Sequence, residues 1–232
     1  MNDRTRLPEW LWLWFPPVLA IIVIGSRLLA PDWYQRVIEP ENGLVELATP
    51  LVSMLGFGVG LLMLRHLYRI PSRLMRVWIL ALTLACLYLA GEELSWGQQL
   101  FKWETPQEMA ALNDQNETNL HNMSSWFDQK PRLLLELWVL IGGIIIPLRR
   151  RLWAPQPRAL FWRWFWPTWE CVPTAVLAIA IKLPERYRDV VGPNALPFEI
   201  RWSEPQEYYF ALFLLIYLLA VNARMHGHST RI

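Results

Sequence analysis

The sequence predicts an all-α, polytopic integral membrane protein with six transmembrane helices, and three observations lead to this fold class. Hydrophobic residues make up 54% of the 232 residues and charged residues only 18%, whereas a soluble domain carries about 25% charge. The mean hydropathy is positive, at +0.19. The chain also contains 15 Trp, a residue that is enriched where membrane and water meet. This composition excludes a disordered chain, a disulfide scaffold and an ordinary soluble enzyme.

Six apolar segments are expected to cross the bilayer, because its core of about 30 Å requires about 20 residues of helix. The expected helices are residues 10–29, 44–64, 77–98, 133–148, 164–181 and 208–222. No signal-peptide cleavage site follows the first segment before Arg27, so we expect an uncleaved anchor. The fourth and sixth are short, and the fifth is interrupted by Pro167, Glu170 and Pro173. We expect one membrane domain, 1–232, with a structured polar loop at 99–132.

The basic residues indicate the orientation of these helices. Thirteen of the 22 Lys and Arg lie in the N-terminal segment, the loops after the second and fourth helices, and the C-terminal tail. The only acids in these regions are Asp3 and Glu9. Because Lys and Arg gather in cytoplasmic loops, we expect both termini in the cytoplasm and the loop 99–132 in the periplasm. The expected location is the inner membrane of a bacterium, where the chain contacts lipid.

Two glutamates lie near the outer end of the third expected helix, in the stretch 91–98 (GEELSWGQ). If this helix runs to Gln98, they lie about 8 Å below the interface at 1.5 Å per residue. Carboxylates at such a depth are costly unless they are protonated, paired or wet, so Glu92 and Glu93 are candidate catalytic residues. They lie on neighbouring helix faces. We therefore expect one in the site and the other paired with an Arg or a Trp N–H, and both assignments stay open.

The expected periplasmic loop contains a very polar run, residues 113–122 (NDQNETNLHN). Glu117 and His121 are four residues apart and, with Glu93, predict a site for one divalent transition metal, Zn²⁺, Mn²⁺ or Fe²⁺. The side chains expected to bind substrate are Gln98, Asn116 and Asn122. In the alternative interpretation the Asn and Asp side chains only cap turns, and the histidine binds a carbonyl.

Acidic residues also precede two other helices on the same side. Glu41 and Glu46 lie at the start of the second expected helix, and Glu204 and Glu207 at the start of the sixth. The two short matches hint at related three-helix halves.

The remaining patterns exclude several site classes. Cys86 and Cys171 both lie in apolar stretches, which is typical of small buried hydrophobes and not of a disulfide or a metal knuckle. The chain has no phosphate-binding loop, dinucleotide fingerprint or basic and aromatic stripe. We expect no nucleic-acid partner.

The two motifs together resemble a family of bacterial multi-pass membrane proteins. Its members carry a Gly-Glu-Glu-x-Ser-Trp-Gly-Gln stretch, which matches residues 91–98, followed by a stretch that ends Asn-Leu-His-Asn, which matches residues 119–122. The resemblance covers some thirty residues well, and it implies that the two motifs act together. It implies no particular activity.

The sequence therefore predicts a membrane-embedded enzyme that hydrolyses or transfers a group on a lipid or lipid-linked substrate at the outer leaflet, with or without a bound metal. The alternative is a non-enzymatic membrane component, either a small transporter or a partner subunit of an envelope complex. In that case the polar residues form a structural network or an ion path, and the chain acts as a homo-oligomer or with an envelope partner protein.

Overall fold

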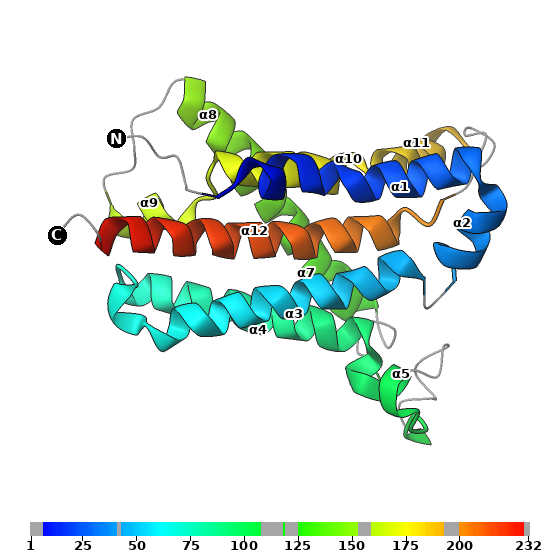
Figure 1. Cartoon of the computed structure of the whole chain (residues 1–232), viewed down its shortest axis with the longest axis horizontal. Helices are drawn as coiled ribbons and strands as arrows, with labels where there is room; N and C mark the ends of the chain where they lie inside the picture. The colour runs from blue at the N-terminus through cyan, green and yellow to red at the C-terminus, as the bar shows by residue number, and fades with distance from the viewer. Residues whose placement is uncertain are drawn as a thin grey trace.

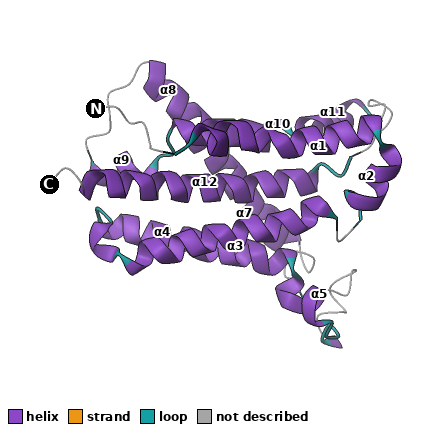
Figure 2. Cartoon of the chain, in the orientation of Figure 1, coloured by secondary structure: helices purple, strands orange, loops and turns teal. Residues whose placement is uncertain are grey.

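All the described elements are helices in the computed structural model of the chain (Figures 1 and 2). The structure describes residues 7–40, 43–107, 118, 125–152, 159–192 and 200–229. Within these ranges, five helices are long and apolar enough to cross a membrane: Trp10–Leu29, Leu44–Arg65, Arg73–Glu93, Lys130–Leu152 and Ser203–His226. The all-α fold with apolar membrane helices is as expected from the sequence.

The helices follow one another in a simple order. They are η1 (Trp10–Trp14), α1 (Phe15–Leu29), α2 (Pro31–Val37), α3 (Leu44–Arg65), η2 (Leu67–Arg69), α4 (Arg73–Glu93), η3 (Ser95–Gly97), α5 (Gln98–Phe101), α7 (Ser125–Trp138), η4 (Val139–Ile145), α8 (Ile146–Leu152), α9 (Leu160–Phe165), η5 (Trp169–Cys171), α10 (Val172–Ala180), α11 (Leu183–Val191) and α12 (Ser203–Ser229). The long helices lie lengthwise side by side, and α7 to α8 crosses behind them (Figure 1).

The bundle has two chemically different ends. The end at the left of Figure 1 holds the turn between α3 and α4, the end of α8, α9 and the last turns of α12. We call it the basic end, because arginines recur there, at positions 65, 69, 149, 150, 151, 163 and 224. The opposite end holds the end of α4 and the start of α12, and we call it the acidic end.

Helix α12 is the centre of the bundle. It contacts α1, α3, α4 and α10, and 78% of its apolar window is buried, against 22–39% for the other four long helices. The side chains from Tyr208 to Leu218 are all buried. A helix that is apolar on every face needs apolar surroundings, which are either lipid or other parts of the protein. For α12 the other helices of this chain provide most of them.

Polar side chains of α12 bind backbone groups of the helices around it. The Tyr209 hydroxyl accepts a hydrogen bond from the Ala20 N–H and donates one to the Pro16 carbonyl, both at 2.9 Å. The hydroxyl thus bridges an N–H and a carbonyl that are four residues apart on α1. Three residues before Tyr209, the Gln206 amide donates to the Ala178 carbonyl in α10 at 3.3 Å. In an apolar environment such bonds avoid the cost of bare backbone groups.

The fifth expected helix, 164–181, is not one helix in the structure. It is divided into α9, η5 and α10, and α10 has only nine residues. The backbone is extended at Trp166 (ψ 135°), because the residue before a proline, here Pro167, is kept out of the helical region. It is extended again at Thr168 (ψ 175°), which precedes η5. The Tyr217 hydroxyl of α12 donates to the carbonyl at this break, Phe165 O, at 2.8 Å.

Three other expected boundaries also differ. The sixth helix is longer than the expected range 208–222, since α12 runs from Ser203 to Ser229. The third helix ends at Glu93 and not at residue 98, so the two glutamates lie in its last turn and the expected depth of about 8 Å does not apply. The fourth helical region begins earlier than residue 133, since α7 starts at Ser125. The first two helices agree closely with the expected ranges 10–29 and 44–64.

Helices α3 and α4 approach closely because small residues line their contact. A Cβ added at Gly60 would lie 2.1 Å from Thr83 Oγ1 and 2.9 Å from Thr83 Cβ, and one added at Gly56 would lie 2.9 Å from Cys86 Sγ. Small residues are the usual means by which membrane helices reach such proximity.

Replacing Gly60 by Ala should therefore lower stability by about 1–3 kcal/mol, since the added methyl group overfills the contact with α4. The matched control is Gly58→Ala on the same helix, where an added Cβ meets nothing within 4 Å and the stability should stay unchanged or rise slightly. Thermal unfolding in detergent measures both. Equal unfolding temperatures for the two variants would contradict the close packing.

The Tyr209→Phe variant should also unfold at a lower temperature, by the equivalent of about 1–3 kcal/mol, because two backbone groups of α1 lose their partner. Tyr208→Phe is the control, because Tyr208 is buried beside it. If both variants unfold like the wild type, the hydroxyl does not stabilise α1.

Candidate functional site

The end of α4 is a left-handed turn. Ser95, Trp96 and Gly97 have positive φ angles of 46°, 53° and 102°. Residues other than glycine rarely adopt this region, and each such residue costs of order 1–3 kcal/mol unless the surroundings hold it. The turn therefore needs specific contacts, and the motif 91–98 provides them.

Trp96 folds back onto the last turn of α4. Its indole N–H donates a hydrogen bond of 2.7 Å to the carboxylate of Glu92, which is 4% exposed. A Cβ at Gly91 would lie 2.9 Å from the indole ring, so glycine leaves the space that the ring occupies. The sequence predicted that one of the two glutamates pairs with an Arg or a Trp N–H. In the structure that residue is Glu92.

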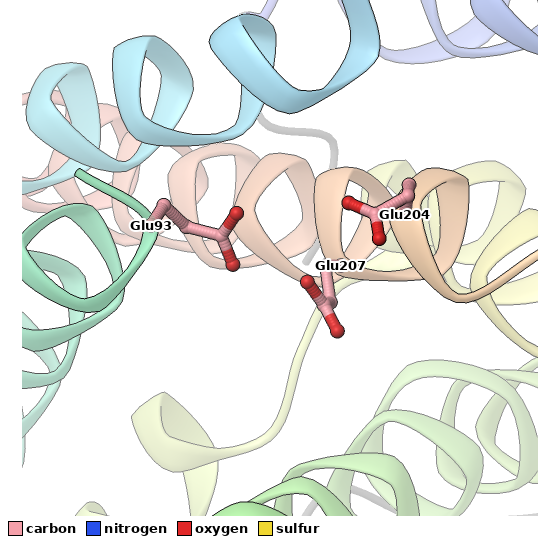
Figure 3. A group of neighbouring side chains, drawn as sticks. All are labelled: Glu93, Glu204 and Glu207. Atoms are coloured by element: carbon pink, nitrogen blue, oxygen red, sulfur yellow. The ribbon is translucent and has the colours of Figure 1, made fainter. Parts of the chain in front are cut away.

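Glu93 points away from this turn and toward the start of α12. There its carboxylate meets those of Glu204 and Glu207, and one oxygen from each lies within 4.8 Å of the others (Figure 3). All three side chains are half-buried. Glu204 and Glu207 are three residues apart and so share one face of α12. We call these three residues the acidic cluster.

The position of one of these acids agrees with helix electrostatics. The first turn of a helix carries unpaired N–H groups and a partial positive charge, which stabilises a carboxylate there. Glu204 lies in the first turn of α12, and the burial of that helix on all sides brings its first turns close to the neighbouring helices. The last residue of α4 completes the cluster.

Two arginines flank the acidic cluster. Arg132 of α7 forms an ion pair with Glu207. Arg201 lies 3.4 Å from Glu204, and its other terminal nitrogen donates to the Glu39 carbonyl at 3.3 Å. With all five side chains ionised, three negative charges face two positive ones, so the cluster keeps an excess of negative charge.

The ligand atoms that the acidic cluster offers suit a hard divalent cation. They are carboxylate oxygens only, and sets of this kind suit Mg²⁺, Ca²⁺ and Mn²⁺, whereas Zn²⁺ prefers sites with nitrogen or sulfur. Of the three metals expected from the sequence, Mn²⁺ agrees best with these three residues. A histidine ligand such as His121 would widen the choice to Zn²⁺ and Fe²⁺.

Gln98 forms hydrogen bonds with three residues of the segment that follows it. Its amide nitrogen donates to Thr105 Oγ1 at 2.8 Å and to the Trp103 carbonyl at 3.2 Å, and its oxygen accepts from the Thr118 N–H at 2.5 Å. The Trp103 indole N–H donates to Thr118 Oγ1 at 3.3 Å. The side chain that was expected to bind substrate is therefore engaged with the loop itself.

The other expected site residues lie outside the described residues. They are Asn116, Glu117, His121 and Asn122. Of the expected metal ligands, the structure describes Glu93, and it brings this residue to Glu204 and Glu207, which the metal prediction did not include. The sequence did show these two glutamates as an acidic start of the sixth helix. That feature was interpreted only as a weak sign of related three-helix halves.

Two further acids near this end have defined surroundings. Glu136 of α7 forms an ion pair with Arg186 of α11, which ties these two helices together. Glu46, in the first turn of α3, lines a pocket beside the acidic cluster.

The fold and the acidic cluster define a helical, multi-spanning membrane protein with a carboxylate site at one end of its bundle. No protein-family model, curated protein or solved structure matches the chain. Proposals about its function therefore depend on the chemistry of its own residues.

Replacing Gln98 by Ala should release the segment that follows it, because three hydrogen bonds to that segment are lost. Limited proteolysis should then cut the region 99–124 several times faster than in the wild type. The control is Gln107→Ala, a change at an exposed position, which should leave the cleavage rate unaltered. An unchanged rate in the Gln98 variant would show that the loop is held by other contacts.

Proposed function

We propose that the chain is a membrane-embedded enzyme that uses a divalent cation to hydrolyse or transfer a group on a lipid or lipid-linked substrate. The observation that supports this proposal is the acidic cluster, in which Glu93 meets Glu204 and Glu207 from a helix more than 100 residues away in the sequence. The cluster lies at the end of five helices that are apolar enough to span a membrane. In a membrane this position would be next to lipid, so a lipid substrate would reach the cluster directly.

In this proposal the three glutamates hold the cation, and His121 of the neighbouring polar run is a further ligand. A divalent cation at such a site supplies Lewis-acid catalysis. The chain's own groups have distinct roles. Arg132 and Arg201 hold two of the carboxylates in place, and Glu92 fixes the turn after α4 through Trp96. Gln98 holds the loop that follows it, and Asn116 and Asn122 bind the substrate.

The proposed topology keeps six crossings with both termini in the cytoplasm of a bacterium. The interrupted segment from α9 to α10 is then the fifth crossing, and the basic end faces the cytoplasm. The distribution of arginines supports this orientation, because such residues gather on the cytoplasmic side of membrane proteins. The acidic cluster would then face the outer leaflet.

A non-enzymatic role has one specific observation in its favour. Glu207 and Glu204 each have an arginine partner, and Glu136 pairs with Arg186, so the polar groups also join α7, α11 and α12. A structural network or an ion path in a transporter or an envelope complex would use the same residues. The two proposals differ in what the removal of one carboxylate does.

The first test is Mn²⁺ binding to the detergent-purified protein by titration calorimetry. The wild type should bind about one ion per chain, and Glu93→Gln and Glu204→Gln should each weaken binding at least about tenfold, since the number of charged ligands sets affinity in such sites. His121→Ala tests the proposed nitrogen ligand and should weaken binding as well. The control is Glu104→Gln, a loss of the same charge at an exposed position.

Stability and turnover separate the two proposals. For an enzyme, Glu93→Gln should abolish Mn²⁺-dependent hydrolysis of a short-chain phospholipid while the unfolding temperature stays near that of the wild type. For a structural network, the same variant should unfold earlier, and wild-type protein should bind no Mn²⁺. The latter result would rule out the metal-dependent enzyme.

A further inference from the structure

Arginines of α8 contact α9 and η5 at the basic end of the bundle (Figure 1). Arg150 and Arg151 lie in the last turn of the apolar span that ends at Leu152. Arg150 donates a hydrogen bond of 3.3 Å to the Trp162 carbonyl in α9. The Arg151 guanidinium lies over the ring of Trp169 in η5, 4.4 Å from the ring centre. We call Arg150, Arg151, Trp162 and Trp169 the arginine–tryptophan surface.

The ring of Trp169 orients Arg151 and leaves its N–H groups available. A guanidinium group is attracted to the face of an indole ring, whereas its five N–H donors lie in its own plane. Arg151 is exposed, and among the described residues it forms no hydrogen bond and no ion pair. The planar fork of a guanidinium group matches a phosphate. Arg151 is therefore held in a position from which it can bind a phosphate of another molecule.

The helices around this surface carry an excess of positive charge. The arginines of α8 and α9 are Arg149, Arg150, Arg151 and Arg163. The acids that the structure describes near them are Glu9, which precedes η1, and Glu170, which is buried in η5. With all of these groups ionised, four positive charges face two negative ones. The charge of the region thus favours an anion as its ligand.

The position of the arginine–tryptophan surface along the bundle corresponds to the level of lipid headgroups. The apolar span ends one residue after Arg151, and the ends of membrane-spanning helices lie at that level. Trp162 and Trp169 are 45% and 38% exposed, and tryptophan is enriched there. Exposed apolar residues precede the arginines in the same span: Ile141, Ile145 and Leu148. The acyl chains of a lipid would cover these residues while its headgroup reaches the arginines.

We propose that the arginine–tryptophan surface binds an anionic phospholipid of the surrounding membrane. The lipid phosphate accepts hydrogen bonds from Arg151, Arg150 adds its charge, and the two indole rings contact the glycerol region. A zwitterionic headgroup binds less well, because it brings an ammonium group close to the arginines. A lipid fits this surface better than an acidic protein does, because it also covers the exposed apolar residues that precede the arginines.

A specific lipid site differs from the general attraction between arginines and anionic lipid. Arginines also occur at the turn between α3 and α4, where Arg65 and Arg73 are exposed. Among the described residues, neither has an aromatic ring beneath its guanidinium. Removing either one changes the charge of the basic end as much as removing Arg151 does. These two arginines are therefore matched controls for Arg151.

The test is lipid retention by the full-length protein in detergent, measured by native mass spectrometry. The protein is first stripped of lipid and then given equal amounts of phosphatidylglycerol and phosphatidylcholine with identical acyl chains. We expect at least about tenfold higher retention of phosphatidylglycerol, since each arginine near an anionic headgroup contributes about fivefold. Equal retention of the two lipids, or a preference for phosphatidylcholine, would overturn the proposal.

Variants of single arginines locate the site. Arg151→Gln should lower phosphatidylglycerol retention about fivefold, whereas Arg65→Gln and Arg73→Gln should stay within about twofold of the wild type. Arg151→Lys keeps the charge but loses the planar fork, so it should lose part of the preference, and it takes the place of Arg151→Gln if that variant does not fold. Equal losses in the three Gln variants would show diffuse attraction and overturn the site, as would full retention in folded Arg151 variants.

The role of the indole ring has its own test. Trp169→Leu should lower phosphatidylglycerol retention as Arg151→Gln does, because the guanidinium loses the ring that orients it, whereas Trp169→Phe keeps an aromatic face and should retain most of the preference. The control is Trp33→Leu on α2, a tryptophan of similar exposure (40%) at the other end of the bundle (Figure 1). A folded Trp169→Leu variant with an unchanged preference would overturn the proposed orientation of Arg151.

A soluble competitor distinguishes a lipid from an acidic protein as the partner. A short polyglutamate peptide should not displace phosphatidylglycerol at equal concentration, because it cannot cover the apolar residues beside the arginines. Displacement at equal concentration would overturn the assignment to lipid and favour an acidic protein.

This inference goes beyond the proposed enzyme and does not depend on it, because the acidic cluster lies at the opposite end of the bundle (Figure 1). All retention measurements contain EDTA, so the proposed cation plays no part in them. A protein that prefers phosphatidylglycerol but binds no Mn²⁺ would keep this inference and reject the metal-dependent enzyme. One that binds Mn²⁺ without a lipid preference would do the reverse.

Discussion

The structure depends on the burial of α12. In this helix 78% of the apolar window is buried, whereas the other four long helices bury only 22–39% of theirs, as helices in contact with lipid can. This constraint fixes the position of its first turns, so Glu204 and Glu207 stand at the middle of one end of the bundle, within reach of the last residue of α4. The acidic cluster and the neighbouring pocket both follow from that position.

Irregular backbone recurs around α12, and α12 compensates for it. Prolines disturb the start of α1 and the segment between α9 and α10, and bare carbonyl and N–H groups are costly in an apolar environment. The hydroxyls of Tyr209 and Tyr217 and the guanidinium of Arg224, which donates to the Arg163 carbonyl at 2.6 Å, bind these groups. The central helix thus combines an apolar surface with a few polar side chains at the points where its neighbours lack regular hydrogen bonds.

Hydropathy predicted most of the fold, because the length and composition of a membrane helix are local properties. It predicted the first two helices almost to the residue. It missed the end of α4 at Glu93, since the left-handed turn there depends on the contact of Trp96 with Gly91 and Glu92. It also treated 164–181 as one helix despite Pro167 and Pro173. The partners of Glu93 could not be predicted from local patterns, because they lie more than 100 residues away and only the packing of α12 brings them near.

The motif 91–98 also shows why two adjacent glutamates are present. Glu92 accepts a hydrogen bond from the indole of Trp96 and so supports the strained turn, and Glu93, one residue later, faces Glu204 and Glu207. Adjacent residues on a helix point about 100° apart. One carboxylate can therefore bind the residue that follows the helix, while the next carboxylate points to a helix that is distant in the sequence.

The place of α12 in the chain has a consequence for biogenesis. Ribosomes make a chain from the N-terminus, so α12 is synthesised after every other described helix. Until it enters the membrane, the Ala20 N–H and the carbonyls of Pro16, Ala178 and Phe165 lack the partners that α12 supplies. The earlier helices are therefore an incomplete assembly during translation. Their final arrangement is reached only when the last helix is inserted between them.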